Sequence, residues 1–199
     1  NVIKEALSSS QSLLEDTVSD LLAVKDRDPS CKYLSEPLLF FKGFKALQAH
    51  RVANWLWKNE RHTLAHFFQS RSSEVYGVDI HPAAQIGKGV MIDHGTGVVI
   101  GETSVVEDNV SIFQGVTLGG TGKQIGDRHP KVREGVLLSA ASTILGNVEI
   151  GRNAKIAAGS VVLTDVKEHT TVAGVPAKEV GDANTEMPAW DVDHSIAKK

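Results

Sequence analysis

The sequence has little of what a disulfide-linked, membrane-spanning or nucleic-acid-binding protein needs. Cys31 is the only cysteine among the 199 residues, which excludes an internal disulfide framework and favours a reducing, cytoplasmic compartment. No apolar run reaches the roughly 18 residues of a transmembrane helix, so we expect no membrane association. Lys and Arg total 21 against 24 for Asp and Glu, and the net charge of −3 gives no basic excess for binding nucleic acid. Because the chain begins at Asn1 and not at Met, the sequence leaves open whether an organelle-targeting segment precedes it.

Aromatic residues are also scarce, at 6% of the chain, whereas glycine is frequent, with 18 residues. This composition suits a repeat architecture of small and aliphatic residues better than an aromatic-centred core. Most of the aromatic residues lie in the first 75 positions, where Leu14, Val18 and Leu21 recur at helical spacing. We predict a helical region over residues 1–75 whose surplus of apolar side chains packs against another subunit.

A six-residue repeat begins near residue 76. Aliphatic residues recur every six positions in three runs, separated by a two-residue slip and by a longer interruption. A period of six fits neither a helix nor a single strand, and it predicts short strands joined by tight turns, with three units closing one triangular coil of about 18 residues. Fourteen positions in register argue against an ordinary sandwich of short strands. They are Ile80, Ile86, Ile92, Val98, Ile100, Val106, Ile112, Leu118, Val132, Leu138, Ile144, Ile150, Ile156 and Val162.

The interruption of the repeat and one histidine carry the chemical signals. Residues 119–131 are rich in glycine and polar residues, so we expect them to protrude as a loop that presents Arg128 and His129. His94 follows Asp93 in a glycine-rich stretch, and a histidine is suited to act as a general base near neutral pH. Asp79 precedes His94 by almost one coil, so we expect its carboxylate one layer below His94, where it would orient the imidazole.

Six motifs together resemble those of the serine acetyltransferase family within the hexapeptide-repeat acyltransferases. They are Asp-Arg-Asp-Pro-Ser (26–30), Val-Asp-Ile-His-Pro-Ala-Ala (78–84), Asp-His-Gly-Thr-Gly (93–97), Val-Thr-Leu-Gly-Gly-Thr-Gly-Lys (116–123), Gly-Asp-Arg-His-Pro-Lys (126–131) and Ala-Gly-Val-Pro-Ala-Lys (173–178). The resemblance covers nearly the full chain. It implies an α+β fold with a helical domain over 1–75, a left-handed parallel β-helix with a protruding loop over 76–178, and a C-terminal tail over 179–199.

The resemblance also implies an activity and its residues. The expected reaction is direct transfer of an acetyl group from acetyl-CoA to the hydroxyl of L-serine, for cysteine biosynthesis, without a metal. The family pattern makes His94 the general base and Asp79 its partner. It places serine at Asp28, Asp93, Arg128 and His129, because an ammonium group favours carboxylates and a carboxylate favours arginine. The matching acetyl-CoA positions are Gly120, Thr121, Ala140, Ala158, Ser160 and Lys178.

The family pattern further implies partners. We expect a homotrimer through the β-helices, doubled to a hexamer through the helical domains, with each site between two subunits. L-Cysteine is expected to act as a feedback inhibitor in the serine pocket, with the C-terminal tail closing on the site. In this family the end of the tail docks into O-acetylserine sulfhydrylase and typically ends in Ile. This chain ends in Lys199, so the docking end is either cut or absent.

Three other interpretations remain open at the level of sequence. His81, His94 and His129 could hold zinc at a subunit interface, as in carbonic anhydrases built on the same repeat. The chain could instead acylate a sugar or an antibiotic, although the helical region and Asp28 argue against this. It could also be a scaffold without activity, which the His94–Asp79 pair and the glycine-rich loop disfavour.

Overall fold

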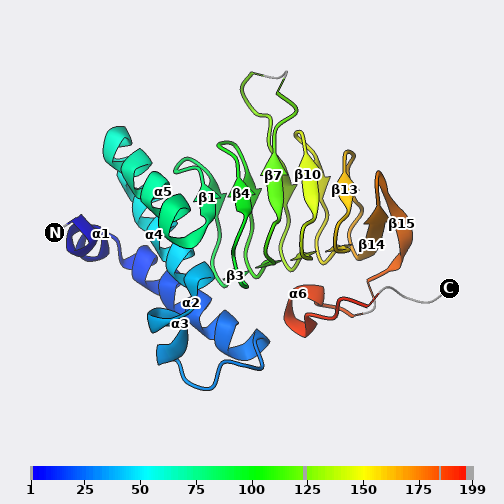
Figure 1. Ribbon diagram of the computed structural model, residues 1–199, viewed down its shortest axis with the longest axis horizontal. Coiled ribbons are helices and arrows are strands. Elements are labelled where there is room, and N and C mark those ends of the chain that lie inside the picture. The colour runs from blue at the N-terminus through cyan, green and yellow to red at the C-terminus, as the bar shows by residue number, and fades with distance from the viewer. Residues whose placement is uncertain (1, 123–124, 184, 196–199) are drawn as a thin grey trace.

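The computed structural model describes residues 2–122, 125–183 and 185–195, and a group of helices leads into a long stack of short strands (Figure 1). Within these ranges no helix combines the length and the hydropathy that a membrane span requires. The helices are α1 (Val2–Ser9), α2 (Gln11–Arg27), α3 (Ser35–Leu39), α4 (Lys42–Lys58) and α5 (His62–Tyr76), with α6 (Pro188–Asp191) near the other end of the chain.

Helix α4 is the centre of the helical region. It packs along α5 and also contacts the first strands, and it buries Phe44, Leu47 and Leu56. Helix α5 ends at Gly77, whose φ of +67° is the left-handed conformation that closes many helices and that glycine adopts without strain. The first strand follows directly, so the end of α5 fixes where the β-helix begins.

The strands wind into a parallel β-helix with three faces. Every neighbouring pair is parallel except β14 and β15, which form an antiparallel hairpin at the last coil. The first face contains β1 (Val78–Ile80), β4 (Val98–Ile100), β7 (Thr117–Gly119), β10 (Thr143–Leu145) and β13 (Val161–Val162). The second contains β2 (Gln85–Ile86), β5 (Val105–Val106), β8 (Lys131–Val132) and β11 (Glu149–Ile150). The third contains β3 (Met91–Ile92), β6 (Ser111–Ile112), β9 (Leu137–Leu138), β12 (Lys155–Ile156), β14 (Thr170–Gly174) and β15 (Ala177–Asp182).

The predicted repeat forms the core of this β-helix. Thirteen of the fourteen aliphatic positions are buried in one hydrophobic cluster, and Ile86 packs against it partly exposed. Each residue points into the triangular section while its neighbours in the chain point outward, because side chains alternate along a strand. The prediction of stacked triangular coils is therefore confirmed.

The coils differ in length. Val78 pairs with Val98 in the first coil and Thr143 pairs with Val161 in a later one, so the first coil is slightly the longer of the two. Thr117 pairs with Thr143, and this coil is the longest of the three because it contains the protruding loop between β7 and β8 (Figure 1). The loop expected at 119–131 therefore leaves the β-helix at the corner between its first and second faces.

The segment after Lys178 is more ordered than a polar tail would be. Strand β15 continues to Asp182, and α6 folds back toward the helical region, where it contacts α2 (Figure 1). Residues 196–199, where the sequence places the end that would dock into O-acetylserine sulfhydrylase, lie outside the described residues.

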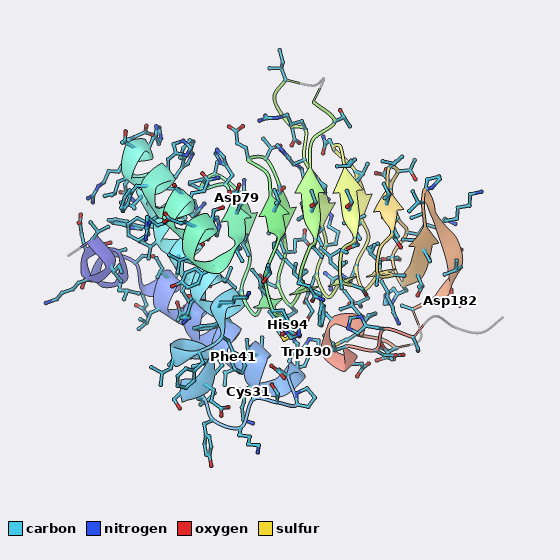
Figure 2. All side chains as sticks on the ribbon, in the orientation of Figure 1. Cys31, Phe41, Asp79, His94, Asp182 and Trp190 are labelled. Atoms are coloured by element: carbon cyan, nitrogen blue, oxygen red, sulfur yellow. The ribbon has the colours of Figure 1, made fainter. Side chains whose placement is uncertain are left out.

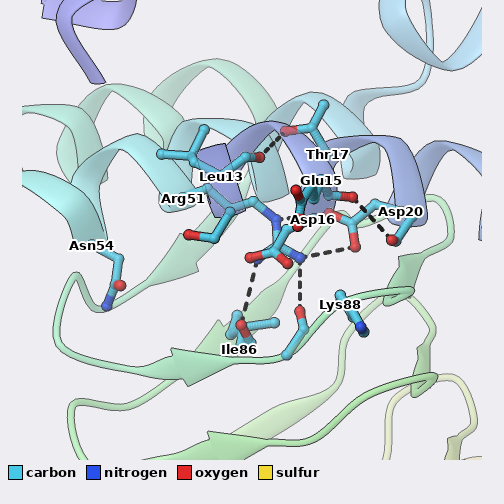
Figure 3. A network of polar contacts seen from close by, with 12 residues as sticks. Leu13, Glu15, Asp16, Thr17, Asp20, Arg51, Asn54, Ile86 and Lys88 are labelled. Atoms are coloured by element: carbon cyan, nitrogen blue, oxygen red, sulfur yellow. Dashed lines mark hydrogen bonds and ion pairs between the residues drawn. The ribbon is translucent and has the colours of Figure 1, made fainter. Parts of the chain in front are cut away.

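A buried ion pair attaches the helical region to the first coil. Arg51 of α4 contacts Asp20 of α2 through Nε and Nη2, each at 2.8 Å, and also donates to the carbonyl of Gly87 at 2.7 Å (Figure 3). Asp20 in turn accepts from the backbone N–H of Val90 at 3.1 Å. Because both side chains contact the turn between β2 and β3, the helices hold a fixed position against the strand that leads into Asp93.

Candidate active site

A cavity of about 310 Å³ lies where the helical region meets the first coil. Three of the predicted site residues line it: Asp28 from the end of α2, and Asp93 and His94 from the turn after β3. The start of α4 forms the opposite wall. Segments distant in sequence thus bring two carboxylates and one imidazole to a single hollow, which contains Asp28 and Asp93 but neither Arg128 nor His129 of the residues predicted to bind serine.

His94 is held in an uncommon backbone conformation. Its φ is +56°, in the left-handed region that non-glycine residues seldom adopt. Its side chain is 71% exposed, and Nε2 lies 3.7 Å from Oδ2 of Asp93. Strain of this kind persists where the surroundings impose it, and it is concentrated at functional sites. The turn therefore presents the imidazole to the cavity with Asp93 beside it.

Gly43, near the start of α4, permits the helix to approach this turn. A Cβ atom at Gly43 would lie 2.1 Å from the carbonyl oxygen of Ile92, the residue before Asp93. The neighbouring Lys42 places its ammonium on the hydroxyl of Thr96. Sequence reasoning missed both residues, although a glycine inside a helical pattern is a signal of close packing.

Burial and two neighbouring charges act on the carboxylate of Asp93. Burial raises the pKa of Asp93 and the nearby Asp28 adds to this, while the charge of His94 acts in the opposite direction. The Oδ1 atom of Asp28 accepts a hydrogen bond from the backbone of Ser30 at 2.8 Å, which fixes the carboxylate after α2. Two acidic groups in one partly buried hollow favour a cationic ligand such as an ammonium group.

The expected position of Asp79 is wrong for a single chain. Asp79 lies on β1 opposite Val99, and its Oδ1 accepts a hydrogen bond from Gln69 at 2.7 Å. The physical reason is the length of the first coil: the chain reaches His94 before the turn is complete, and the residue one layer from Asp79 is Val99. Figure 2 shows Asp79 and His94 at separate places on the β-helix. Within one chain, Asp93 and not Asp79 is the carboxylate beside the imidazole.

Arg128 and His129 also lie apart from the cavity, at the base of the loop. Arg128 donates to Glu102 at 2.6 Å, and Thr103 contacts both residues. Asp79 belongs to the same region, because the charges of Asp79 and His129 both act on the imidazole of His81. We call Asp28, Asp93 and His94 the pocket group, and Asp79, Arg128 and His129 the loop group.

Four of the residues expected to bind acetyl-CoA also divide between the edge that carries the pocket group and the loop. Ala140 and Ala158 lie in the turns that follow β9 and β12, on the edge where His94 follows β3, so they continue that edge coil by coil. Gly120 and Thr121 follow β7 at the loop. Lys178 is exposed on β15, whereas Ser160 is fully buried and its hydroxyl accepts a hydrogen bond from Gly174, which leaves its side chain no free surface.

The C-terminal segment covers the third face close to the pocket group. Trp190 of α6, which is labelled in Figure 2, stacks on the guanidinium of Arg27 at 4.6 Å, and Arg27 is the residue before Asp28. Ser111 donates a hydrogen bond to the carbonyl of Ala189 at 2.7 Å, and the ring of His194 packs on Phe113 at 4.5 Å. The segment therefore contacts the residue next to the pocket.

The described residues do not gather into a metal site. Over residues 2–122, 125–183 and 185–195, no group of three or more His, Cys, Asp or Glu side chains is arranged to hold a metal ion. His94 lies on one edge of the β-helix, and His81 and His129 lie together elsewhere. A zinc site of these three histidines is not assembled within one chain.

Comparison with known proteins defines the class. Residues 129–164 match the family model "Bacterial transferase hexapeptide (six repeats)", which describes this repeat in transferases. Residues 1–49 match the model "Serine acetyltransferase, N-terminal". A curated serine acetyltransferase from Salmonella typhimurium is 55% identical over 96% of this chain and 70% of its own length. The chain belongs to the serine acetyltransferase family.

Two solved structures extend the comparison. A serine acetyltransferase in complex with cysteine has a TM-score of 0.96 and 52% identity, over 98% of this chain and 76% of that one. The enzyme from Brucella abortus in complex with coenzyme A has a TM-score of 0.90 and 52% identity, over 91% of this chain and 72% of that one. The predicted fold class is confirmed, and the chain is an acyltransferase that transfers acetyl from acetyl-CoA to L-serine.

Proposed function

We propose that the pocket group performs the chemistry of this serine O-acetyltransferase, with His94 as the general base. The observation that carries the proposal is the convergence of Asp28, Asp93 and His94 on one cavity. Asp28 and Asp93 pair with the ammonium of L-serine. His94 then receives the proton of the serine hydroxyl, because its exposed imidazole lies at the cavity and a ring nitrogen can accept a proton there.

The transfer is direct. The serine oxygen attacks the carbonyl carbon of the thioester while His94 takes its proton, which gives a tetrahedral oxyanion. Backbone N–H groups near Gly120 stabilise the charge. Collapse of the intermediate breaks the C–S bond, and the imidazolium returns the proton to the departing thiolate. Cys31 is buried, with its thiol directed at the carbonyl of Tyr33, so it is unsuited to form an acyl-enzyme.

The loop group completes the site from a second copy of the chain. Arg128 would bind the serine carboxylate bidentately, and Asp79 would approach the imidazole of the neighbouring copy. Support comes from the separation of the two groups within one chain and from the exposed apolar side chains of the helical region. Leu14, Val18, Leu22, Leu39 and Phe40 are among these exposed residues. We propose a trimer through the β-helices and a hexamer through the helical regions.

Acetyl-CoA would then lie between two β-helices. The small residues Ala140 and Ala158 continue the edge of His94 and would line the cleft on one copy, while Gly120 and Thr121 would line it on the other. The exposed Lys178 could meet a phosphate of coenzyme A, since an ammonium is a good phosphate partner. The buried hydroxyl of Ser160 would shape the turn and not contact the cofactor.

Three further proposals concern regulation, a protein partner and cellular location. We propose that L-cysteine inhibits by occupying the serine pocket, as supported by the related structure in complex with cysteine. Docking into O-acetylserine sulfhydrylase through the C-terminal end is proposed only for a chain that carries the docking residues. The single buried thiol of Cys31 supports a cytoplasmic location.

Replacement of His94 tests the proposed base. In His94→Ala, turnover of acetyl-CoA with L-serine should fall by about two to four orders of magnitude, because general-base catalysis is worth that much. His62→Ala is the matched control, since this exposed histidine of α5 lies outside the cavity. Near-normal turnover in His94→Ala would remove the residue from this role. A preference for other small alcohols over L-serine would overturn the assignment of substrate.

A further inference from the structure

Thr103, in the turn between β4 and β5, holds the base of the loop through a single hydroxyl. Its Oγ1 accepts hydrogen bonds from the backbone N–H groups of Arg128 and His129, at 3.0 and 3.1 Å. The same oxygen lies 2.9 Å from Nδ1 of His129. Because two N–H donors occupy the oxygen lone pairs, the hydroxyl proton is available for donation to Nδ1.

A second donor points at the same ring nitrogen. The backbone N–H of Thr103 donates to Nδ1 of His129 at 3.2 Å. This donor does not depend on the hydroxyl, which also has the carboxylate of Asp127 nearby as an acceptor. A ring nitrogen that accepts hydrogen bonds carries no proton, so the neutral imidazole carries its proton on Nε2. One residue, Thr103, therefore determines which nitrogen of His129 is a donor.

The ring is packed against backbone, and Nε2 remains accessible. A Cβ atom at Gly101 would lie 2.0 Å from Cδ2 and 2.1 Å from Nε2 of His129, so the imidazole occupies space that only glycine leaves free. The residue is 7% exposed. Nε2 has no hydrogen-bond partner in the described part of the chain, and it is not among the fully buried unpartnered atoms there, so it keeps some accessible surface.

The charges around His129 agree with a neutral ring. Burial is the largest effect and lowers the pKa of His129, and the cations Arg128 and Lys131 act in the same direction. Glu102 and Asp127 oppose them, but Glu102 is already paired with Arg128 and Asp127 with Lys131. The ring is thus surrounded by groups whose charges are largely compensated.

We propose that Thr103 is a positioning residue that holds His129 with its proton on Nε2, so that His129 donates a hydrogen bond to the bound amino acid and does not serve as a second base. The inference rests on the proposed function, because it concerns the amino-acid site. Beside Arg128, an Nε2–H donor would bind a carboxylate oxygen of L-serine, and the two histidines of the site would have opposite roles.

The proton position can be measured without an activity assay. Long-range ¹H–¹⁵N correlation spectra of the full chain, labelled at histidine, distinguish the two tautomers, and the His129 signals are identified by their loss in His129→Gln. We expect the Nε2–H form in the wild type and in Thr103→Ser. Thr103→Val loses the hydroxyl donor and keeps the backbone N–H donor, so the fraction of the Nε2–H form should fall and a mixture of forms should appear. A wild-type ring that is protonated on Nδ1, or on both nitrogens at neutral pH, would overturn the inference.

Kinetics test the consequence for binding. Thr103→Val should raise KM for L-serine by about two- to fivefold, because only the fraction of molecules with the proton on Nε2 then offers the donor, with kcat changed by less than about threefold. Thr103→Ser should stay close to the wild type. His129→Gln, whose amide N–H can replace Nε2–H, should retain kcat if His129 is a donor and lose it if His129 is a base. Melting temperature and elution volume establish that each variant folds and assembles.

The outcomes separate the two proposals. If the wild type does not acetylate L-serine, the proposed function fails whatever the spectra show. If it does, and Thr103→Val alters neither the tautomer nor KM, the role of Thr103 is wrong while the function stands. Loss of kcat in a folded His129→Gln variant would likewise contradict the donor role.

Discussion

The candidate site residues differ in how well their positions could be predicted from sequence motifs. His94 and Asp93 could be predicted as a pair because they are adjacent in sequence and lie in a glycine-rich turn. Asp28 required the family resemblance, since nothing in its own segment indicates that the end of α2 reaches the turn after β3. The position of Asp79 could not be predicted, because the length of the first coil depends on a slip in the repeat whose structural effect the sequence does not reveal.

His50 of α4 makes folding sensitive to acid. Complete burial, followed by the charge of Arg51, lowers the pKa of His50 from 6.5 to about 3. Between these values the unfolded chain binds a proton that the folded chain does not, so stability should fall as the pH drops from 6.5 toward 3. The loss attributable to His50 is about 1.4 kcal/mol per pH unit.

Denaturant unfolding of the wild type and of His50→Gln, at fixed protein concentration and at several pH values, measures this contribution. The variant should show a shallower decline of the free energy of unfolding on the acid side. Equal slopes for the two proteins would mean that His50 does not remain neutral in the folded state.

The secondary-structure elements could be predicted in the part of the chain that carries the six-residue repeat. The aliphatic repeat located the strands, since an inward-facing position every six residues admits few other structures. How the helices attach to the β-helix was not predictable, because it depends on a buried pair from α2 and α4. Asp20 and Arg51 are distant in the sequence and have no signal that distinguishes them from surface charges.

Removing one member of this pair should loosen the helical region. In Arg51→Met, Asp20 would remain buried without its cation and the carbonyl of Gly87 would lose its donor. We expect a loss of about 3 to 5 kcal/mol in the free energy of unfolding. Arg61→Met is the matched control: it removes an exposed ion pair with Glu5 and should cost less than about 1 kcal/mol. Similar losses in both variants would show that the buried pair has no special role.

The whole molecule presents two groups of candidate site residues at different places on one β-helix. The pocket group lies where the helical region meets the third face. In the loop group, Arg128 and His129 lie at the corner between the first and second faces, and Asp79 lies on β1 of the first face. A rigid stack of coils cannot bend to bring them together. Sequence analysis could assign both groups to one activity, but their separation within the chain is a property of the folded structure.

Co-assembly of two inactive variants tests whether each site is shared. Chains carrying His94→Ala and chains carrying Arg128→Ala, purified through two different tags, should regain activity together. Random pairing of equal amounts would rebuild about a quarter of the sites. The control is co-assembly of His94→Ala with Asp93→Ala, which should stay inactive because both changes affect the pocket group. No recovery in the first mixture would contradict a site formed between copies.

The stacking of Trp190 on Arg27 has a consequence for how the chain can be shortened. The last helix of the molecule covers a guanidinium that belongs to its second helix, one position before Asp28. Trimming the chain ahead of α6 would expose that guanidinium to water and remove the carbonyl to which the Ser111 hydroxyl donates. A deletion near the C-terminal end would therefore change the surroundings of the proposed serine pocket, which the helical region helps to build.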